Sequence, residues 1–206
     1  MDKELFTRIL QVTVVVVVLL LFIFLFIGID IFSFKGISKL PSIVSLVVLF
    51  WAFYISFGWK WPILKLLAYK ENLNGTWFGT YTSINVMTKE KFEGQIAVVI
   101  RQTFIMINVK SYTSNYVNHS YGEVLNYNNK SDTNQLIYLY SQNEYNPTSD
   151  DDRKGTSELQ LNYSNKKKGL FGKFWTNHNS QGHVNLSKLT RKQLKSFDEA
   201  LIYSTK

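Results

Sequence analysis

Two long apolar runs open the chain, and a region in which polar and apolar residues alternate follows them. The apolar runs, 9–29 and 40–59, contain no formally charged residue. At about 1.5 Å of helical rise per residue, each run covers roughly 30 Å, the thickness of the hydrocarbon core of a bilayer. The pattern therefore predicts a two-helix transmembrane hairpin, with helices at about 9–34 and 40–61.

The charges around these runs predict their orientation. The short segment between the runs, which carries two lysines, leaves room only for a tight hairpin, so both termini are expected on the same side of the membrane. Five basic residues flank the pair on the terminal side: Lys3, Arg8, Lys60, Lys65 and Lys70. Basic flanks favour the cytoplasm, so both termini and the remaining chain are predicted to be cytoplasmic. A cleaved signal peptide is the alternative for the first run, but the run exceeds the roughly 7 to 15 residues of such a segment and no small-residue cleavage site follows.

The ends of the two predicted helices carry residues typical of a membrane surface. Asp30 follows the first run, and its polar neighbours favour the headgroup level over the membrane interior. Trp59 and Trp61 end the second run, where aromatic residues commonly mark the interface, and Pro62 is expected to end the helix.

From residue 71 onward the alternation predicts strands. In LNGTWFGTY (73–81), Trp77 and Tyr81 have the same parity and are expected on one face. Residues 95–110 fit one long or bent strand. Further strands are predicted at 118–127, 135–142, 156–164, 169–177 and 182–189, separated by connections rich in Asn, Asp and Gly. This spacing indicates an all-β sandwich or an antiparallel barrel, and closure would remove the exposed edges.

The last residues return to a helical period. Leu194, Phe197 and Leu201 recur at helical spacing, which predicts a C-terminal helix at 190–203 with Thr190 as its cap. The predicted division is thus a membrane region at 1–70 and a water-soluble β domain at 71–206.

Composition narrows the functional classes. The chain has a net charge of +8 and no cysteine, and its part from residue 71 carries 16 Lys and Arg against 12 Asp and Glu. This mild excess suits an anionic ligand or nearby anionic lipid headgroups. The three histidines form no H-E-x-x-H motif, and no G-x-S-x-G motif occurs, so we expect no enzyme. Solvated turns are favoured over a metal or nucleic-acid site for the charged runs at 150–152 and 166–168, so no metal, cofactor or nucleic acid is expected.

Several segments together resemble one protein family. They are GTWFGTY (75–81), IRQTF (100–104), GEVLN (122–126), YLYSQNEYNP (138–147), GTSELQL (155–161) and GKFWTNHNSQGHVNL (172–186). With the preceding helix pair, the chain resembles the CD-NTase-associated effectors that combine two transmembrane helices with a β-barrel. These effectors belong to bacterial cyclic-oligonucleotide-based anti-phage signalling systems (CBASS).

The resemblance implies a fold and a function. The fold would be an eight-stranded, lipocalin-like antiparallel barrel that binds a cyclic dinucleotide made by a partner nucleotidyltransferase upon infection. Binding would drive homo-oligomerisation and disrupt the bacterial inner membrane, killing the infected cell (abortive infection). The family pattern G-x-aromatic-x-T corresponds here to Gly172, Phe174 and Thr176, and His178 stands where the family often has an arginine.

Candidate site residues follow from what such a ligand needs. Bases need flat aromatic faces and hydrogen-bonding partners, and phosphodiesters need cationic donors. The predicted ligand-binding residues are Tyr81, Gln102, Tyr138, Tyr140, Thr176 and His178. Arg101 and Lys173 are candidate phosphate contacts, although Arg101 would face solvent if Gln102 faces inward. Trp77 is expected to close one end of the barrel.

Two other functions remain open at this point. A membrane-bound, lipocalin-like carrier of a lipid or other apolar ligand would have a wholly apolar interior. A structural membrane anchor would have a barrel filled by its own side chains.

Overall fold

The computed structural model of the protein describes residues 3–28, 38, 40–67, 70–128, 133–144, 153–164 and 167–205, which form two compact units. The helical unit consists of Met1–Asn72 and Thr103–Ile105, and the β unit consists of Leu73–Gln102 and Met106–Lys206. The predictions made for Asp30, for the acidic run at 150–152 and for Lys166 lie outside the described residues.

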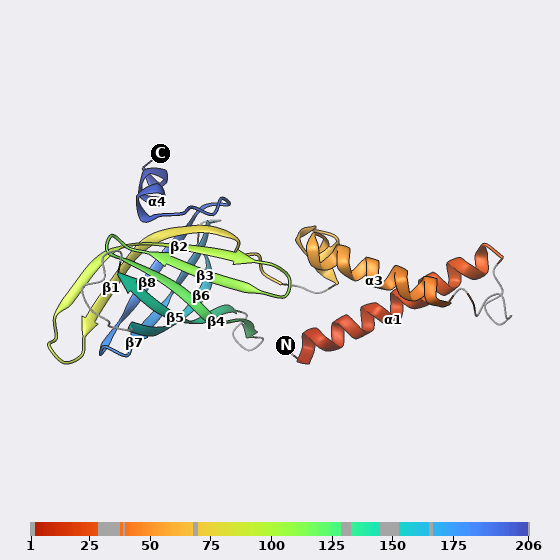
Figure 1. The fold of residues 1–206 in the computed structure, drawn as a ribbon, viewed down its shortest axis with the longest axis horizontal. Coiled ribbons are helices and arrows are strands. Elements are labelled where there is room, and N and C mark those ends of the chain that lie inside the picture. Colours follow the sequence, from red (N-terminus) through yellow and green to blue (C-terminus); the bar gives the residue numbers. More distant parts are fainter. Residues whose placement is uncertain are drawn as a thin grey trace. The chain divides into compact units, whose positions relative to one another are not determined.

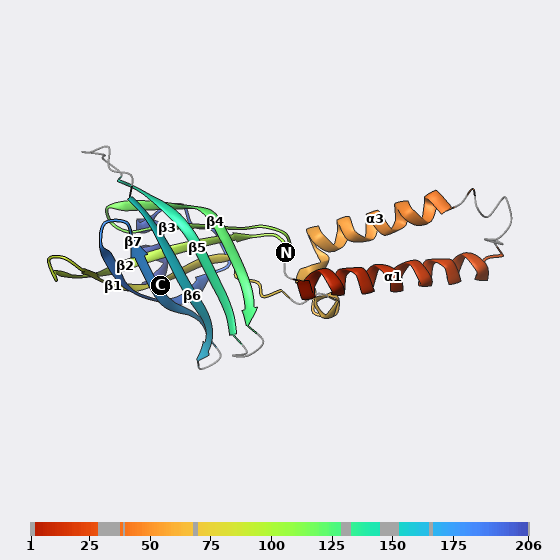
Figure 2. The ribbon, with the colours of Figure 1, turned by 90° about the horizontal axis from the view of Figure 1, so that it is seen from below.

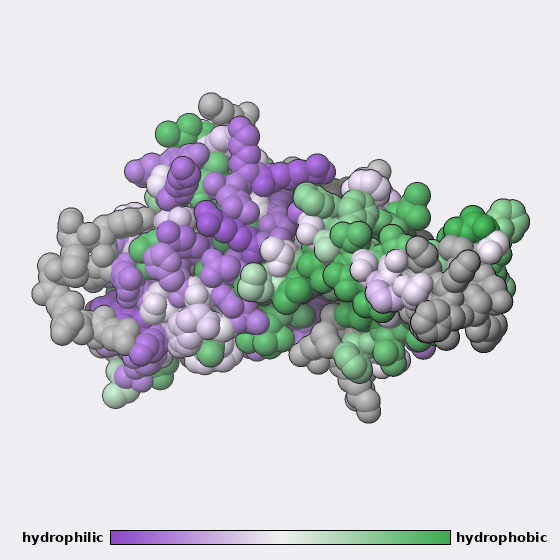
Figure 3. All heavy atoms as spheres, turned by 45° about the vertical axis from the view of Figure 1, so that its right-hand side comes forward, coloured by the Kyte–Doolittle hydropathy of each residue, from purple (hydrophilic) through white to green (hydrophobic). Residues whose placement is uncertain are grey.

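The helical unit contains an antiparallel pair, α1 (Lys3–Phe26) and α3 (Leu40–Ser56), which lie side by side in both ribbon views (Figures 1 and 2). Trp51 Nε1 donates to Thr13 Oγ1 at 3.0 Å and joins the two helices. Figure 3 shows hydrophobic residues gathered over this unit. The segment Phe6–Phe26 is long and apolar enough to cross a membrane, whereas the apolar segment Pro41–Ser56 is shorter. One spanning helix is therefore supported, and the second span stays a prediction.

The chain after α3 does not continue as the helix predicted to residue 61. Two single turns of 3-10 helix follow, η1 (Gly58–Lys60) and η2 (Leu64–Leu66). Trp59 is buried with Tyr54 and Phe104, while Trp61 is 55% exposed. Only Trp61 of the two tryptophans thus has the exposure expected of a residue at a membrane surface.

The β unit is a closed barrel of eight strands, each antiparallel to the next, with β1 and β8 paired to complete the circle (Figures 1 and 2). The strands are β1 (Gly75–Asn85), β2 (Lys91–Gln102), β3 (Ile107–Tyr112), β4 (Tyr116–Asn128), β5 (Thr133–Glu144), β6 (Arg153–Ser164), β7 (Lys167–Thr176) and β8 (Ser180–Thr190). The predicted all-β domain is confirmed. Of the two architectures that the sequence allowed, a sandwich and a barrel, the domain forms the barrel.

The single strand predicted at 95–110 is wrong, because the chain turns between β2 and β3 at residues 103–106. Phe104 in this turn is buried among residues of the helical unit. Phe104 is apolar because of this contact with residues far away in sequence. The apolar pattern therefore continues through the turn, and the alternation does not reveal it.

The barrel wall alternates as strands do, with one set of side chains facing inward. Trp77 faces inward with no exposed surface, and Tyr81 packs against the same interior cluster, as predicted. The buried members of this cluster are Leu73, Trp77, Ile96, Val98, Ile100, Ile107, Val109, Leu136, Tyr138, Tyr140, Leu159, Leu161, Leu170, Val184 and Leu186.

The C-terminal helix is shorter than predicted and begins later. It is α4 (Phe197–Ser204), and Ser196 caps it by accepting a hydrogen bond from the Glu199 N–H at 3.1 Å. Thr190 is the last residue of β8 and is not the cap. The intervening chain is held out of the helix because Thr76 Oγ1 accepts from the Leu194 N–H at 3.0 Å.

Candidate functional site

The antiparallel order of the strands gives the barrel two distinct ends. Turns at 86–90, 113–115 and 177–179 lie at one end, which we call the mouth. β1 and β3 begin, and β2 and β8 finish, at the opposite end, which we call the base. Most of the predicted ligand-binding residues lie in the half of the barrel nearer the mouth.

Three aromatic rings of the inner wall each lie over a glycine on a neighbouring strand. Tyr140 pairs with Gly155, and a Cβ placed on that glycine would lie 2.5 Å from the Cζ and hydroxyl oxygen of Tyr140. Tyr81 covers Gly94 in the same way, with 2.8 Å to its Cε1. Phe174 covers Gly182, again at 2.8 Å. The missing side chains let these rings lie close to the wall, as in other sheets where an aromatic covers a glycine.

Tyr138 and Tyr140 form an adjacent pair on β5. Their ring centroids are 5.9 Å apart and the ring planes are inclined by 47°. Burial raises the pKa of both hydroxyls, and a hydrogen bond with Ser157 partly opposes the shift at Tyr138. Both tyrosines therefore stay neutral at physiological pH and present hydroxyl groups inside the barrel.

Tyr81, on β1, is a third tyrosine that packs against the interior cluster. It is half-buried and meets the Phe174 ring nearly edge-on, with 6.4 Å between the centroids. Burial raises the pKa of its hydroxyl, and Tyr116 adds to this shift. Tyr81 is thus an inward aromatic with partial access to solvent.

Thr176 and His178 lie at the mouth, where β7 turns into β8. Thr176 Oγ1 accepts hydrogen bonds from the His178 N–H at 3.3 Å and the Ser180 N–H at 3.4 Å. The register places Thr176 beside Gly155, and therefore next to the ring of Tyr140. Both predicted residues are half-buried, and Thr176 also stabilises the turn.

Gln102 lies at the base rather than near the mouth. Its side-chain Oε1 accepts a hydrogen bond from the Leu73 N–H at 2.8 Å. Its backbone N–H donates to Asn74 Oδ1, and its carbonyl accepts from Asn74 Nδ2, both at 2.7 Å. Gln102 faces inward, as its parity suggested. Its side-chain amide oxygen is already bonded to Leu73, in the segment that leads into β1.

Trp77 also lies at the base, the position expected of a residue that closes the barrel. Its Nε1 donates to the Leu73 carbonyl at 2.9 Å. Lys188 Nζ lies 4.5 Å from the centre of the Trp77 ring and donates to the carbonyls of Leu73, at 3.0 Å, and Asn74. Indole, ammonium and carbonyl groups thus meet at this end of the barrel, and closure by Trp77 stays a prediction.

Lys188 is a candidate that sequence reasoning missed. It has the parity of Val184 and Leu186, whose side chains are buried in the interior cluster, so parity along β8 could have identified it. Burial lowers its pKa to about 8, with smaller contributions from Lys168 and Arg191. It is an inward-facing cation beside an aromatic plane.

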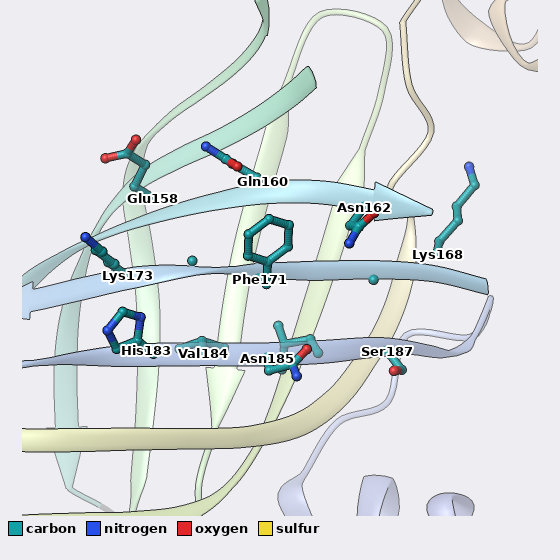
Figure 4. A pocket seen from close by; sticks show the side chains of 13 residues that line it. Glu158, Gln160, Asn162, Lys168, Phe171, Lys173, His183, Val184, Asn185 and Ser187 are labelled. Carbon is teal, nitrogen blue, oxygen red and sulfur yellow. The ribbon is translucent and has the colours of Figure 1, made fainter. Parts of the chain in front are cut away.

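The two predicted phosphate contacts face outward. Arg101 and Lys173 are both exposed, and each has the parity opposite to its buried neighbours. Lys173 lies in a groove of about 890 Å³ on the outer face of β6, β7 and β8 (Figure 4). The labelled polar side chains of this groove include Glu158, Gln160 and His183. A ligand inside the barrel would not meet either Arg101 or Lys173.

Comparison with known proteins adds the family. A family model described as Cap15, cyclic dinucleotide receptor domain, matches residues 70–188, from the segment before β1 into the end of β8. No curated protein matches the chain. The matched family is a ligand-binding domain and not a known catalytic one. Because the match covers more than half of the 206 residues and those residues form the closed barrel, the protein belongs to the Cap15 family of CBASS effectors and carries its cyclic dinucleotide receptor domain.

Proposed function

We propose that the protein is a membrane effector of anti-phage defence that takes a cyclic dinucleotide into the mouth half of its barrel. The observation that carries this proposal is the group of inward aromatic rings beside Thr176 near the mouth. A cyclic dinucleotide presents two flat bases with polar edges, and stacking of one base on an aromatic ring contributes about 1 to 3 kcal/mol.

Each predicted contact has a distinct role in this proposal. Tyr81, Tyr138 and Tyr140 offer ring faces for stacking and hydroxyls for the polar edges of the bases. Thr176 and His178 offer hydrogen-bonding groups at the rim of the mouth.

The phosphodiesters need donors of a different kind. Lys188 is an inward cation, but it lies at the base, where it donates to the carbonyls of Leu73 and Asn74, so it would serve a phosphodiester only if the ligand extended from the mouth half to the base. Gln102 would assist only if its bond to Leu73 were released on binding. Arg101 and Lys173 would serve a ligand held on the outer surface, and we rank them below Lys188.

The output of binding is proposed to occur in the bacterial inner membrane. α1 is long and apolar enough to span it, and the flanking lysines favour cytoplasmic termini and a cytoplasmic barrel. A ligand can drive oligomerisation only if the oligomer binds it more tightly than the resting form does. Assembly of many helix pairs in one patch of lipid would then disrupt the bilayer and kill the infected cell.

A lipocalin-like carrier of a lipid or other apolar ligand is the second candidate. It requires a wholly apolar interior. The described interior instead includes the hydroxyls of Ser157, Tyr138 and Tyr140 and the ammonium group of Lys188. A lumen lined with such groups is not wholly apolar, which favours a polar guest over a hydrocarbon one.

The test uses the full-length protein in detergent. Calorimetry against a panel of cyclic dinucleotides should detect one tight binder, and size measurement should show a larger assembly only with that ligand. Tyr140→Ala should weaken binding about 5- to 150-fold, the equivalent of one lost stacking contact. Tyr163→Ala, which truncates an exposed aromatic on β6, is the matched control and should bind normally.

Two results would overturn the proposal. One is the failure of every cyclic dinucleotide to bind or to change the size of the assembly. The other is equal binding by the Tyr140 and Tyr163 variants, which would move the site out of the barrel.

A further inference from the structure

The turn between β2 and β3 carries three consecutive large apolar residues. Phe104 is 4% exposed, whereas Ile105 and Met106 are 67% and 68% exposed. Adjacent apolar side chains at a loop tip are unfavourable in water, where a turn is ordinarily polar. The tip therefore needs an apolar environment that covers Ile105 and Met106 but not the hydrogen-bonding strands behind them.

Phe104 identifies which part of the protein this tip belongs to. Its ring meets that of Tyr54 at 79° with 5.2 Å between centroids, and it lies 6.4 Å from the ring of Trp59. Lys70 Nζ donates to the Phe104 carbonyl at 2.6 Å. Thr103–Ile105 accordingly groups with the helices rather than with the strands that flank it.

The contacts of Phe104 also give its depth. Tyr54 lies in the last turn of α3, and lysines follow at 60, 65 and 70. Basic residues beyond the end of an apolar helix lie at the headgroup level, with aromatic residues just inside it. A residue that packs against Tyr54 therefore lies near the boundary between headgroups and acyl chains.

The residues around this boundary have the composition of an interfacial surface. Phe57, Trp61 and Ile63 are 63%, 55% and 80% exposed, and Lys60 lies 5.4 Å from the Trp59 ring centre. Large apolar groups interspersed with lysines are typical of protein surfaces that enter the headgroup layer of an anionic membrane.

We propose that Ile105 and Met106, at the tip of the β2–β3 hairpin, insert into the interfacial layer of the bilayer that holds α1. The hairpin thereby supplies a third attachment to the membrane, formed by a strand turn and separate from the helix pair. This attachment does not depend on the ligand, and its partner is the lipid surface itself.

A second apolar turn among the described residues of the barrel provides a matched control. Met87, in the turn between β1 and β2, is 75% exposed, and that turn lies at the mouth end. It has a similar side chain and exposure, but no residue of its turn groups with the helical unit.

The chain has no cysteine, so single sites can be labelled directly. Full-length Ile105→Cys, Met106→Cys and Met87→Cys, each carrying an NBD fluorophore, are reconstituted in phosphatidylcholine–phosphatidylglycerol vesicles. Lipids with brominated acyl chains should quench the labels at 105 and 106 about fivefold more than the label at 87. Iodide in the buffer should show the reverse order.

Equal quenching by brominated lipid at all three sites would overturn the proposal. So would labels at 105 and 106 that are shielded from iodide without being quenched by brominated lipid, because a second copy of the chain would then cover the tip. Circular dichroism of each labelled variant establishes that the barrel is folded before the comparison is made.

Discussion

Substitution of Gly155 by alanine tests whether the inner wall near the mouth is shaped for a flat ring. The new Cβ would lie 2.5 Å from the Cζ and hydroxyl oxygen of Tyr140 and 2.9 Å from the Trp175 carbonyl oxygen. Carbon atoms in contact lie about 3.5 to 4.0 Å apart, so the ring has to move by roughly 1 Å or more. Overpacking of this kind costs about 1 to 3 kcal/mol of unfolding free energy.

The ring displacement also affects ligand binding. If Tyr140 stacks on a base, its displacement should weaken cyclic dinucleotide binding about 5- to 150-fold. Urea denaturation of the full chain in detergent measures the first effect, and calorimetry measures the second. Gly122→Ala is the matched control, because its Cβ would meet nothing nearer than Leu139 Cδ1 at 3.5 Å. Equal stability and equal affinity for the two variants would refute the reasoning.

Four further substitutions test the base and the outer face. Lys188→Met reports whether the ligand reaches the base: calorimetry should show weaker binding if it does and unchanged affinity if the ligand stays in the mouth half. Burial lowers the pKa of Lys188 to about 8, so between about pH 8 and 10.5 the unfolded chain binds more protons than the folded one. The unfolding free energy of the wild type, measured by urea denaturation, should therefore rise through that window. The Lys188→Met variant should lack this rise. Thr76→Val should cost about 1 to 3 kcal/mol in the same assay, because the buried Leu194 N–H loses its acceptor; an unchanged midpoint would contradict this bond. Arg101→Ala and Lys173→Ala should change cyclic dinucleotide affinity less than about twofold, since both side chains face solvent, and a larger loss would place the ligand outside the barrel.

The alternation of residues predicted much of the barrel and of its inner wall. Trp77 and Tyr81 face inward as their common parity indicates, and Arg101 faces outward opposite Gln102. Parity fails where the chain turns, and the turn at 103–106 merged β2 and β3 in the prediction; it also shifts at the irregularity between Ser120 and Gly122 of β4. The apolar character of Phe104 there serves a contact with Tyr54, far away in sequence, rather than strand formation.

The functional groups were less predictable than the strands. The hydrogen bond from the Leu73 N–H to the Gln102 side chain joins residues far apart in sequence, and no local pattern predicts it. The pairing of each inward ring with a glycine could not be predicted either, because the sequence does not show which residues of neighbouring strands lie side by side. Lys188 is different, since its parity along β8 with the buried Val184 and Leu186 could have identified it from the sequence.

The backbone of Leu73, where the chain enters the barrel, takes part in three hydrogen bonds to side chains. The Leu73 N–H bonds to Gln102, and the Leu73 carbonyl accepts from both Trp77 and Lys188. Asn74 adds two further bonds to the backbone of Gln102. These bonds connect the start of β1 to β1, β2 and β8 at once, so a pull on the chain before Leu73 would be shared among three strands. The first strand is therefore held in register from its first residues by both of the strands that flank it.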